Sequence, residues 1–146
     1  MSDPTSKPAT LAERAARTEA VLAAFRDKPF SWKGRANCIH LARAQLSAFG
    51  HAPPPVPQFG TALGARKALE KRKFASLEAL IDSMLPRVTP AGLWVGDIAL
   101  VPGTSGFGAF WIAVGGGNMI GWHRDDPSRM RAIEVGGGGI IAAWRT

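Results

Sequence analysis

Apolar residues near the start of the chain recur at helical spacing. The positions that share one face of a helix are Leu11, Ala15, Thr18, Leu22 and Phe25. Thr10 and Glu13 have the spacing of a capping box, in which the hydroxyl accepts from a first-turn amide and the carboxylate reaches back. Pro29 follows as a stop signal. This pattern predicts a helix over residues 10–26.

Three further segments carry helix signals. Asn37 is a favoured N-cap for a helix over residues 38–49, and Gly50 stands where helices commonly end. Residues 61–73 form a strongly basic helical pattern, and a short helix is expected over residues 77–85. The first half of the chain is therefore predicted to be helical.

After Pro90 the pattern changes to short apolar or alternating runs that glycine and proline separate. Such runs are typical of strands in an antiparallel sheet. The expected strands cover residues 97–101, 107–114, 118–123, 129–135 and 140–144. The glycine runs 115–117 and 136–139 are interpreted as hairpin turns, because neither opens into a helical pattern as a phosphate-binding loop would.

The order of these elements predicts an α+β fold, in which N-terminal helices pack on a C-terminal antiparallel β-sheet. At 146 residues the chain has the length of one domain. Residues 1–9 are polar and contain two prolines, so we expect them to form a flexible N-terminal tail. Residues 10–146 are expected to form the single domain.

Composition excludes several classes of protein. No apolar run approaches the length of a membrane-spanning helix, and the N-terminus lacks the apolar segment of a secretory signal. A single cysteine excludes an internal disulfide framework and a cysteine-cluster zinc site. With three histidines and no metalloprotease pattern, we expect neither a metal site nor a cofactor.

The balance of charge favours anionic partners. The chain carries 18 Lys and Arg against 11 Asp and Glu, a formal net charge of +7. One predicted helix holds a basic cluster: Arg66, Lys67, Lys71, Arg72 and Lys73. This cluster is either a solvated helix face or a contact surface for an anionic partner. Nucleic acid is the least favoured partner, because no recognisable binding motif accompanies the charge.

Cys38 is the one residue whose position suggests chemistry. It opens a predicted helix directly after the Asn37 cap. The unpaired amides and the dipole of a helix N-terminus stabilise a thiolate, which is the reactive form of cysteine. The same amides can form an oxyanion hole for acyl transfer. The alternative is that Cys38 is a small buried hydrophobe, as free cysteines commonly are.

A thiolate nucleophile also needs a base within hydrogen-bonding reach. His40 lies about 200° around the helix from Cys38 and should point away from it. His51 begins a proline-rich loop and is expected at the surface, whereas His123 ends a predicted strand and could approach Cys38 through the fold. The catalytic hypothesis is a dyad of Cys38 and His123, with Asn37 either assisting or serving only as the helix cap.

The nucleophile segment resembles that of a known family. Cys38 opening a helix after residues 32–37 resembles NlpC/P60-type papain-like cysteine peptidases, and more closely their small relatives encoded in phage and prophage tail-gene clusters. The segments similar to successive core strands of that family are residues 96–101, 109–115 and 118–121. The resemblance implies a papain-like arrangement of the α+β fold.

The sequence departs from the family pattern at the partner residues. The family's second strand begins with the catalytic histidine, where this chain has Ala109. The family's third polar group aligns with Gly121, and the aspartate common before the nucleophile is Asn37. His123, two residues beyond Gly121, should turn to the same face of its strand. Because loss of a triad member costs on the order of a thousandfold in rate, weak or lost hydrolysis is favoured.

The resemblance implies two functions of different class. In the first, the protein is a thiol-dependent amidase or endopeptidase that acts on peptidoglycan peptides of the cell wall. In the second, it is a structural component of a phage or phage-like tail, whose partners are other tail proteins. For this second function we expect Trp32 and Trp122, near the predicted cleft, to be interface residues. In either case the protein would be made in the bacterial cytoplasm without a signal peptide, and the resemblance implies incorporation into a virion or phage-like tail.

Overall fold

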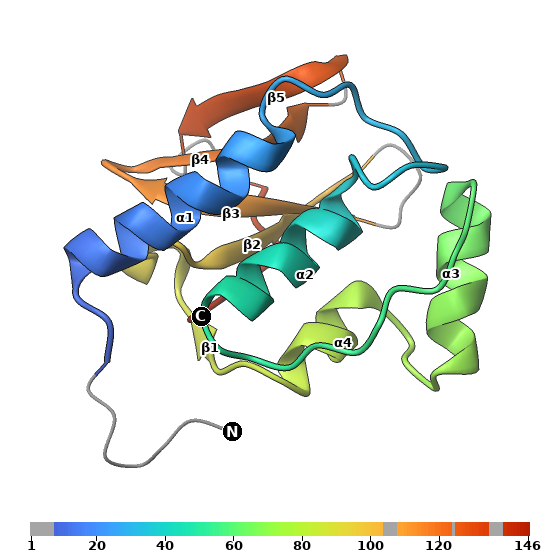
Figure 1. Cartoon of the computed structure of the whole chain (residues 1–146). Coiled ribbons are helices and arrows are strands. Elements are labelled where there is room, and N and C mark those ends of the chain that lie inside the picture. The colour runs from blue at the N-terminus through green and yellow to red at the C-terminus, as the bar shows by residue number, and fades with distance from the viewer. Residues whose placement is uncertain (1–7, 104–107, 124, 135–138) are drawn as a thin grey trace.

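The structure, a computed structural model, describes residues 8–103, 108–123, 125–134 and 139–146. In this part of the chain, four α-helices are followed by a six-stranded antiparallel sheet with strand order β1-β6-β2-β3-β4-β5 (Figure 1). The predicted α+β fold, with N-terminal helices and C-terminal strands, is confirmed. Some predicted features extend outside the described residues. These are residues 1–7 of the expected tail, residues 107 and 135 of two expected strands, and residues 136–138 of the second glycine turn.

The helices begin where their capping residues predict. They are α1 (Leu11–Phe25), α2 (Cys38–Ala48), α3 (Ala62–Lys71) and α4 (Leu77–Asp82). Thr10 and Glu13 form the predicted capping box, and the side chains of Asn37, Thr61 and Ser76 each accept a first-turn amide. The last helix ends three residues earlier than predicted. No helix in the described residues is long and apolar enough to cross a membrane.

The strands follow the predicted order with different boundaries. They are β1 (Arg87–Val88), β2 (Ile98–Val101), β3 (Ala109–Gly115), β4 (Asn118–His123), β5 (Asp126–Glu134) and β6 (Ala142–Trp144), with a 3-10 helix, η1 (Pro90–Gly92), after β1. The sequence did not indicate β1 or η1. Gly115, Gly116 and Gly117 all have positive φ and turn β3 into β4, as predicted.

Alternation along the strands sends side chains to two faces of the sheet. We call one the helix face, because α1, α2 and α4 pack on it (Figure 1). Its strand residues are Ile98, Leu100, Phe110, Ile112, Ile120, Trp122, Met130, Ala142 and Trp144. The other, the back face, carries Ala99, Trp111 and Met119. Trp111 is a core residue, as its place in an apolar strand indicates.

Candidate functional site

Cys38 lies in the first turn of α2, where the helix packs on β3. The Asn37 side chain caps this turn by accepting a hydrogen bond from the backbone amide of His40 at 3.1 Å. Backbone amides of Cys38, Ile39 and Phe110 interact with the sulfur and favour its thiolate. The structure thus has the amide environment that the sequence predicts for a cysteine at a helix N-terminus.

Burial outweighs those amides. The Cys38 side chain belongs to the apolar core of the helix face, and the residue is only 3% exposed. Burial raises the pKa of the Cys38 thiol to about 11, because the charged form loses its solvation. At pH 7 about one molecule in ten thousand would carry the thiolate, the form that attacks a carbonyl. The geometry is that of a packed thiol.

Asn37 is occupied by structural contacts. Its side-chain amide nitrogen donates to the carbonyl oxygens of Ser31 at 3.2 Å and Gly34 at 3.1 Å, while its oxygen accepts from His40. The residue is fully buried. These contacts bind the loop before α2 to the start of the helix, so the capping role suggested by the sequence is the one that the structure shows.

The structure does not bring His123 to Cys38. The His123 ring meets the Trp111 ring edge-on, with centroids 6.4 Å apart, and Trp111 belongs to the back face. Its Nδ1 accepts from the Asp125 amide at 3.1 Å. Cys38 packs against the helix face instead. No hydrogen bond joins the two side chains in the described part of the chain, so the dyad would need a rearrangement.

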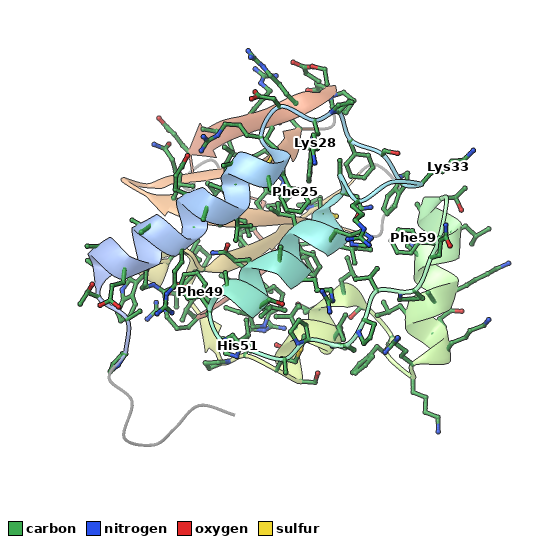
Figure 2. The ribbon with its side chains drawn as sticks, viewed as in Figure 1. Phe25, Lys28, Lys33, Phe49, His51 and Phe59 are labelled. Atoms are coloured by element: carbon green, nitrogen blue, oxygen red, sulfur yellow. The ribbon has the colours of Figure 1, made fainter. Side chains whose placement is uncertain are left out.

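The other two histidines also have partners elsewhere. His40 stacks on Phe59, with ring centroids 6.3 Å apart, and its pKa is lowered by burial and then by the charges of Arg35 and Arg43. His51 is partly buried rather than a free surface residue, and its Nε2 lies 3.3 Å from the carbonyl oxygen of Thr146. Figure 2 shows His51 just beyond α2 and Phe59 beside α3. Neither histidine is hydrogen-bonded to Cys38.

Ala109 and Gly121 are the positions at which the family resemblance implies polar partners. Ile112 of β3 pairs with Ile120 of β4, and this pairing brings Trp111 of β3 beside Gly121 of β4. Ala109 packs against the cores of both faces, so it lies where the two faces meet. The Trp111 ring covers Gly121 so closely that a β-carbon there would be 2.6 Å from Cδ2. The chain therefore has a methyl group and an indole where the family resemblance implies polar partners.

Trp122, an expected interface residue, is turned away from the surface in this structure. Trp122 is 7% exposed and belongs to the core of the helix face. Its indole N–H donates to the Lys28 carbonyl at 2.8 Å, and its ring meets Phe25 and Phe30 edge-on. Strand alternation turns Trp122 inward, where it fixes the chain beyond α1 to the sheet.

Trp32 and the basic cluster lie nearer the surface. Trp32 is partly buried and meets the rings of Phe30 and Phe59 edge-on, with centroids 5.0 and 5.9 Å away. The predicted basic residues are all exposed on and just after α3: Arg66, Lys67, Lys71, Arg72 and Lys73. Arg72 donates to the Pro55 carbonyl at 3.0 Å. A role for these residues in binding stays a prediction.

Sequence reasoning missed the most heavily hydrogen-bonded side chain near the helices. Asp97 is fully buried, and its carboxylate accepts from Arg14 at 2.7 Å and from Arg145 at 2.8 Å. It also accepts from the backbone amides of Trp94 at 2.8 Å and Thr146 at 3.0 Å. Two cations and two amides thus balance one buried carboxylate. In the sequence, the feature that could have indicated this site was a single acidic residue at the start of an apolar strand.

Gly96 completes this structural junction. Its φ is +95°, and a β-carbon would lie 2.6 Å from the Phe49 ring and 2.9 Å from the Thr18 hydroxyl oxygen. The Gln45 side chain donates to the Gly96 carbonyl at 2.9 Å and to Thr18 at 3.0 Å. The Gly96–Asp97 pair therefore joins α1, α2 and the start of β2, so its role in this structure is architectural.

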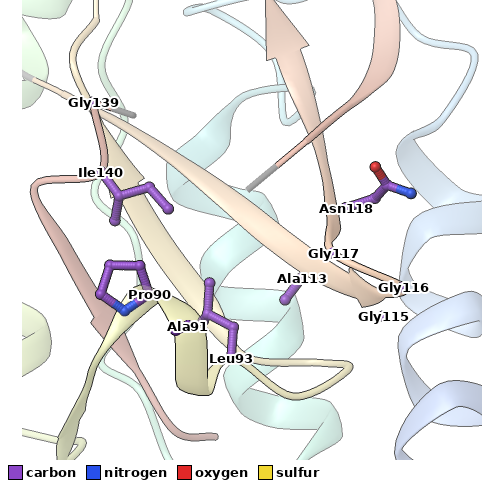
Figure 3. Close-up of a pocket in the computed structure, with 10 residues that line it drawn as sticks. All are labelled: Pro90, Ala91, Leu93, Ala113, Gly115, Gly116, Gly117, Asn118, Gly139 and Ile140. Carbon is purple, nitrogen blue, oxygen red and sulfur yellow. The ribbon is translucent and has the colours of Figure 1, made fainter. Parts of the chain in front are cut away.

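A pocket of about 590 Å³ lies at the glycine turn after β3 (Figure 3). Its lining residues are Pro90, Ala91, Leu93, Ala113, Gly115, Gly116, Gly117, Asn118, Gly139 and Ile140. None of them has a titratable or nucleophilic side chain, and Asn118 alone offers a polar side chain. No cluster of metal-binding residues occurs in the described parts of the chain. The described lining of this pocket therefore offers no side chain for acid–base or nucleophilic chemistry.

Comparison with protein families gives one match. The family described as "Domain of unknown function (DUF6950)" matches residues 10–146, nearly the whole chain, and the chain belongs to this family. A search of curated proteins finds no match. The matched range includes all the helices and strands from α1 to β6 and leaves the function to be argued from the site.

Proposed function

We propose that this DUF6950 domain is a non-hydrolytic relative of NlpC/P60-type papain-like peptidases, acting as a structural component of a phage or phage-like tail. The fold class supports this relationship at a coarse level, because helices precede an antiparallel sheet in the chain. The nucleophile-like Cys38 opens a helix that packs on β3, the strand similar to the family's histidine-bearing strand. The tail assignment is supported by the resemblance to tail-cluster relatives.

The proposal that the protein does not hydrolyse peptides rests on the burial of the Cys38 thiol and its raised pKa. This thiol is buried, its pKa is raised to about 11, and none of the three histidines is hydrogen-bonded to it. A thiol nucleophile requires both a deprotonated sulfur and a general base. Cys38 has neither in this arrangement. A core role explains every contact that Cys38 makes.

A weak hydrolase is the alternative, and the presence of a histidine on the strand next to β3 favours it. His123 ends β4, which pairs with β3, so its imidazole is one strand removed from the position that the family resemblance implies. If the start of β3 opened, His123 could approach Cys38 and act as its base. This arrangement would need both exposure of the sulfur and a new orientation of His123, which now contacts Trp111.

An assay on peptidoglycan fragments tests the proposal. The wild-type protein and the variants Cys38→Ala and His123→Asn would be incubated with purified muropeptides, and the products followed by mass spectrometry. A known NlpC/P60 peptidase in parallel shows that the substrate can be cleaved. We expect no product from any of the three proteins. Cleavage by the wild type that is lost in both variants would contradict the proposal and support the dyad.

A second experiment addresses the tail. Tail particles purified from the source strain would be analysed by mass spectrometry and by immunogold electron microscopy with an antibody against this chain. We expect the chain to be a stoichiometric component at one position on the particle. Particles that assemble normally and lack the chain would contradict the structural role.

A further inference from the structure

The outer side of α3 has an unusual combination of exposed groups. This helix stands at one side of the molecule, apart from the α1–α2 layer (Figure 1). Ala65 and Leu69 face inward and are buried. Leu63 and Lys67, which lie about 40° apart on a helical wheel, face outward. Leu63 is 61% exposed, so a large apolar side chain stands among lysines in solvent.

Three lysines on and just after this helix have no carboxylate partner among the described residues. Residues 61–73 contain five basic residues and one acidic residue, Glu70. In the described part of the chain, no salt bridge involves Lys67, Lys71 or Lys73. Other basic residues have carboxylate partners, namely Arg14, Arg17, Arg26, Arg87 and Arg145. The outer side of α3 therefore carries a net positive charge, although exposed Glu70 lies about 20° from Leu63 on the same side.

The neighbouring loop extends this surface. A β-carbon on Gly60 would lie 3.4 Å from the Cγ of Lys33, so the Lys33 stem runs beside the start of α3. Figure 2 shows Lys33 and Phe59 at this end of the helix. Trp32 packs on Phe59 from the same loop. We define the basic-leucine face as Lys33, Leu63, Arg66, Lys67, Lys71 and Lys73; Arg72 turns to the other side of the helix, where it donates to the Pro55 carbonyl.

We propose that the basic-leucine face docks on an anionic phospholipid surface. Lysine and arginine are attracted to anionic headgroups, and an exposed leucine gains free energy at the boundary between headgroups and acyl chains. Duplex nucleic acid would attract the same charges, but its phosphate backbone offers no apolar region for Leu63. The apolar group amid the basic residues thus favours lipid. This docking is independent of the proposed function, because it uses none of the residues around Cys38.

Vesicle co-sedimentation tests the lipid partner. The full chain would be mixed with phosphatidylcholine vesicles with and without phosphatidylglycerol. We expect binding only to the anionic vesicles, and weaker binding at high salt because surface charges are then screened. Equal binding to both vesicle types, or no binding to either, would overturn the proposal.

Matched charge variants test the location. The double variant Lys67→Gln/Lys71→Gln should weaken binding by about 25-fold, since each basic residue near an anionic surface contributes about a fivefold factor. Arg129→Gln/Arg131→Gln removes the same charge from exposed positions on β5 and should leave binding almost unchanged. Equal losses in the two double variants would show that net charge, rather than this face, causes binding, and would overturn the assignment.

Matched apolar variants test the role of Leu63. Leu63→Ser should weaken binding severalfold, whereas Leu11→Ser, at a leucine of 62% exposure on α1, should not. Wild-type vesicle affinity of Leu63→Ser, together with tighter binding to duplex DNA than to vesicles, would overturn the lipid assignment in favour of nucleic acid.

A variant at Lys73 distinguishes an effect on vesicle binding from an effect on folding stability. Lys73 has a φ of +66°, a conformation that favours glycine, at the end of α3. Lys73→Gly should therefore raise the melting temperature while weakening vesicle binding by about fivefold. Unchanged binding in this more stable variant would remove Lys73 from the docking surface and contradict the extent of the face proposed here.

Discussion

Asp97 and Cys38 are both buried polar groups near the helices, and they differ in what surrounds them. Asp97 meets two arginines and two backbone amides, so its charge is balanced. Cys38 meets backbone amides and apolar side chains, and burial keeps its thiol protonated. The two buried groups therefore differ in their partners: Asp97 is hydrogen-bonded to two cations, whereas the Cys38 sulfur interacts with backbone amides, and burial raises the pKa of its thiol.

The difference bears on how the family resemblance should be used. In the proposed relationship to NlpC/P60 peptidases, both residues belong to segments that correspond to family motifs. The glycine–aspartate segment needs only packing and hydrogen bonds, and the structure supplies them through Arg14 and Arg145. The cysteine segment needs an imidazole for chemistry, and Ala109 stands at that position. In that proposed relationship, the glycine–aspartate segment has its structural partners, and the cysteine segment has no imidazole hydrogen-bonded to it among the described residues.

The largest effect is expected at Asp97. Asp97→Asn should lower the free energy of unfolding by about 3–5 kcal/mol, because it leaves buried Arg14 without a carboxylate partner. Urea unfolding followed by tryptophan fluorescence measures this change. Glu19→Gln, which breaks an exposed ion pair with Arg26, is the matched control and should change stability far less, because solvent screens an exposed pair. Equal effects at the two sites would contradict the role assigned to Asp97.

A smaller effect is expected from the Cys38 thiol at alkaline pH. Its folded pKa of about 11 lies above the ordinary value of 9.0. The thiol therefore contributes stability that is fully present below pH 9 and is lost as pH rises through 11. The stability difference between the wild type and Cys38→Ala should shrink by about 2 kcal/mol by pH 11. A difference that stays constant from pH 8 to 11 would show that the thiol is not buried as described.

The smallest effect is expected from a variant that places an imidazole near Cys38. Ala109→His places an imidazole next to Phe110, whose backbone amide interacts with the sulfur. The thiol pKa should fall by about one unit, which raises the alkylation rate near neutral pH about tenfold. Ala109→Asn is the control without a titrating ring. Circular dichroism would show that both variants fold, and equal rates in the two would contradict the position assigned to residue 109.

Local signals predicted most of the helices and strands, because caps and periodicity act over a few residues. The Thr10–Glu13 capping box and the Asn37 cap are confirmed. The predicted fourth helix was too long: the structure ends it at Asp82, where the Ser83 hydroxyl donates to the Leu80 carbonyl. β5 begins at Asp126, earlier than predicted, and so includes Pro127. A proline is tolerated in this strand because β5 lies at the edge of the sheet, where one N–H donor can be missing.

The contacts of the candidate site could not be predicted to the same extent. Asp97 has partners 83 and 48 positions away in the chain, Arg14 and Arg145, and no local pattern shows that they meet. The face of the strand on which His123 lies depends on the register between β3 and β4. Position alone allowed Cys38 to be either nucleophile or core residue. Its packing against the strand residues of the helix face supports the second.

Alkylation of native Cys38 tests the central claim most directly. The protein would be treated with iodoacetamide from pH 6 to 9, with urea-unfolded protein as the reference, and modification followed by intact-protein mass spectrometry. The structure predicts negligible modification of the folded protein and complete modification of the unfolded one, because the thiol is buried and its pKa is raised. Rapid modification of the folded protein at pH 6–7 would mean an accessible thiolate, and would contradict the assignment of Cys38 to the core.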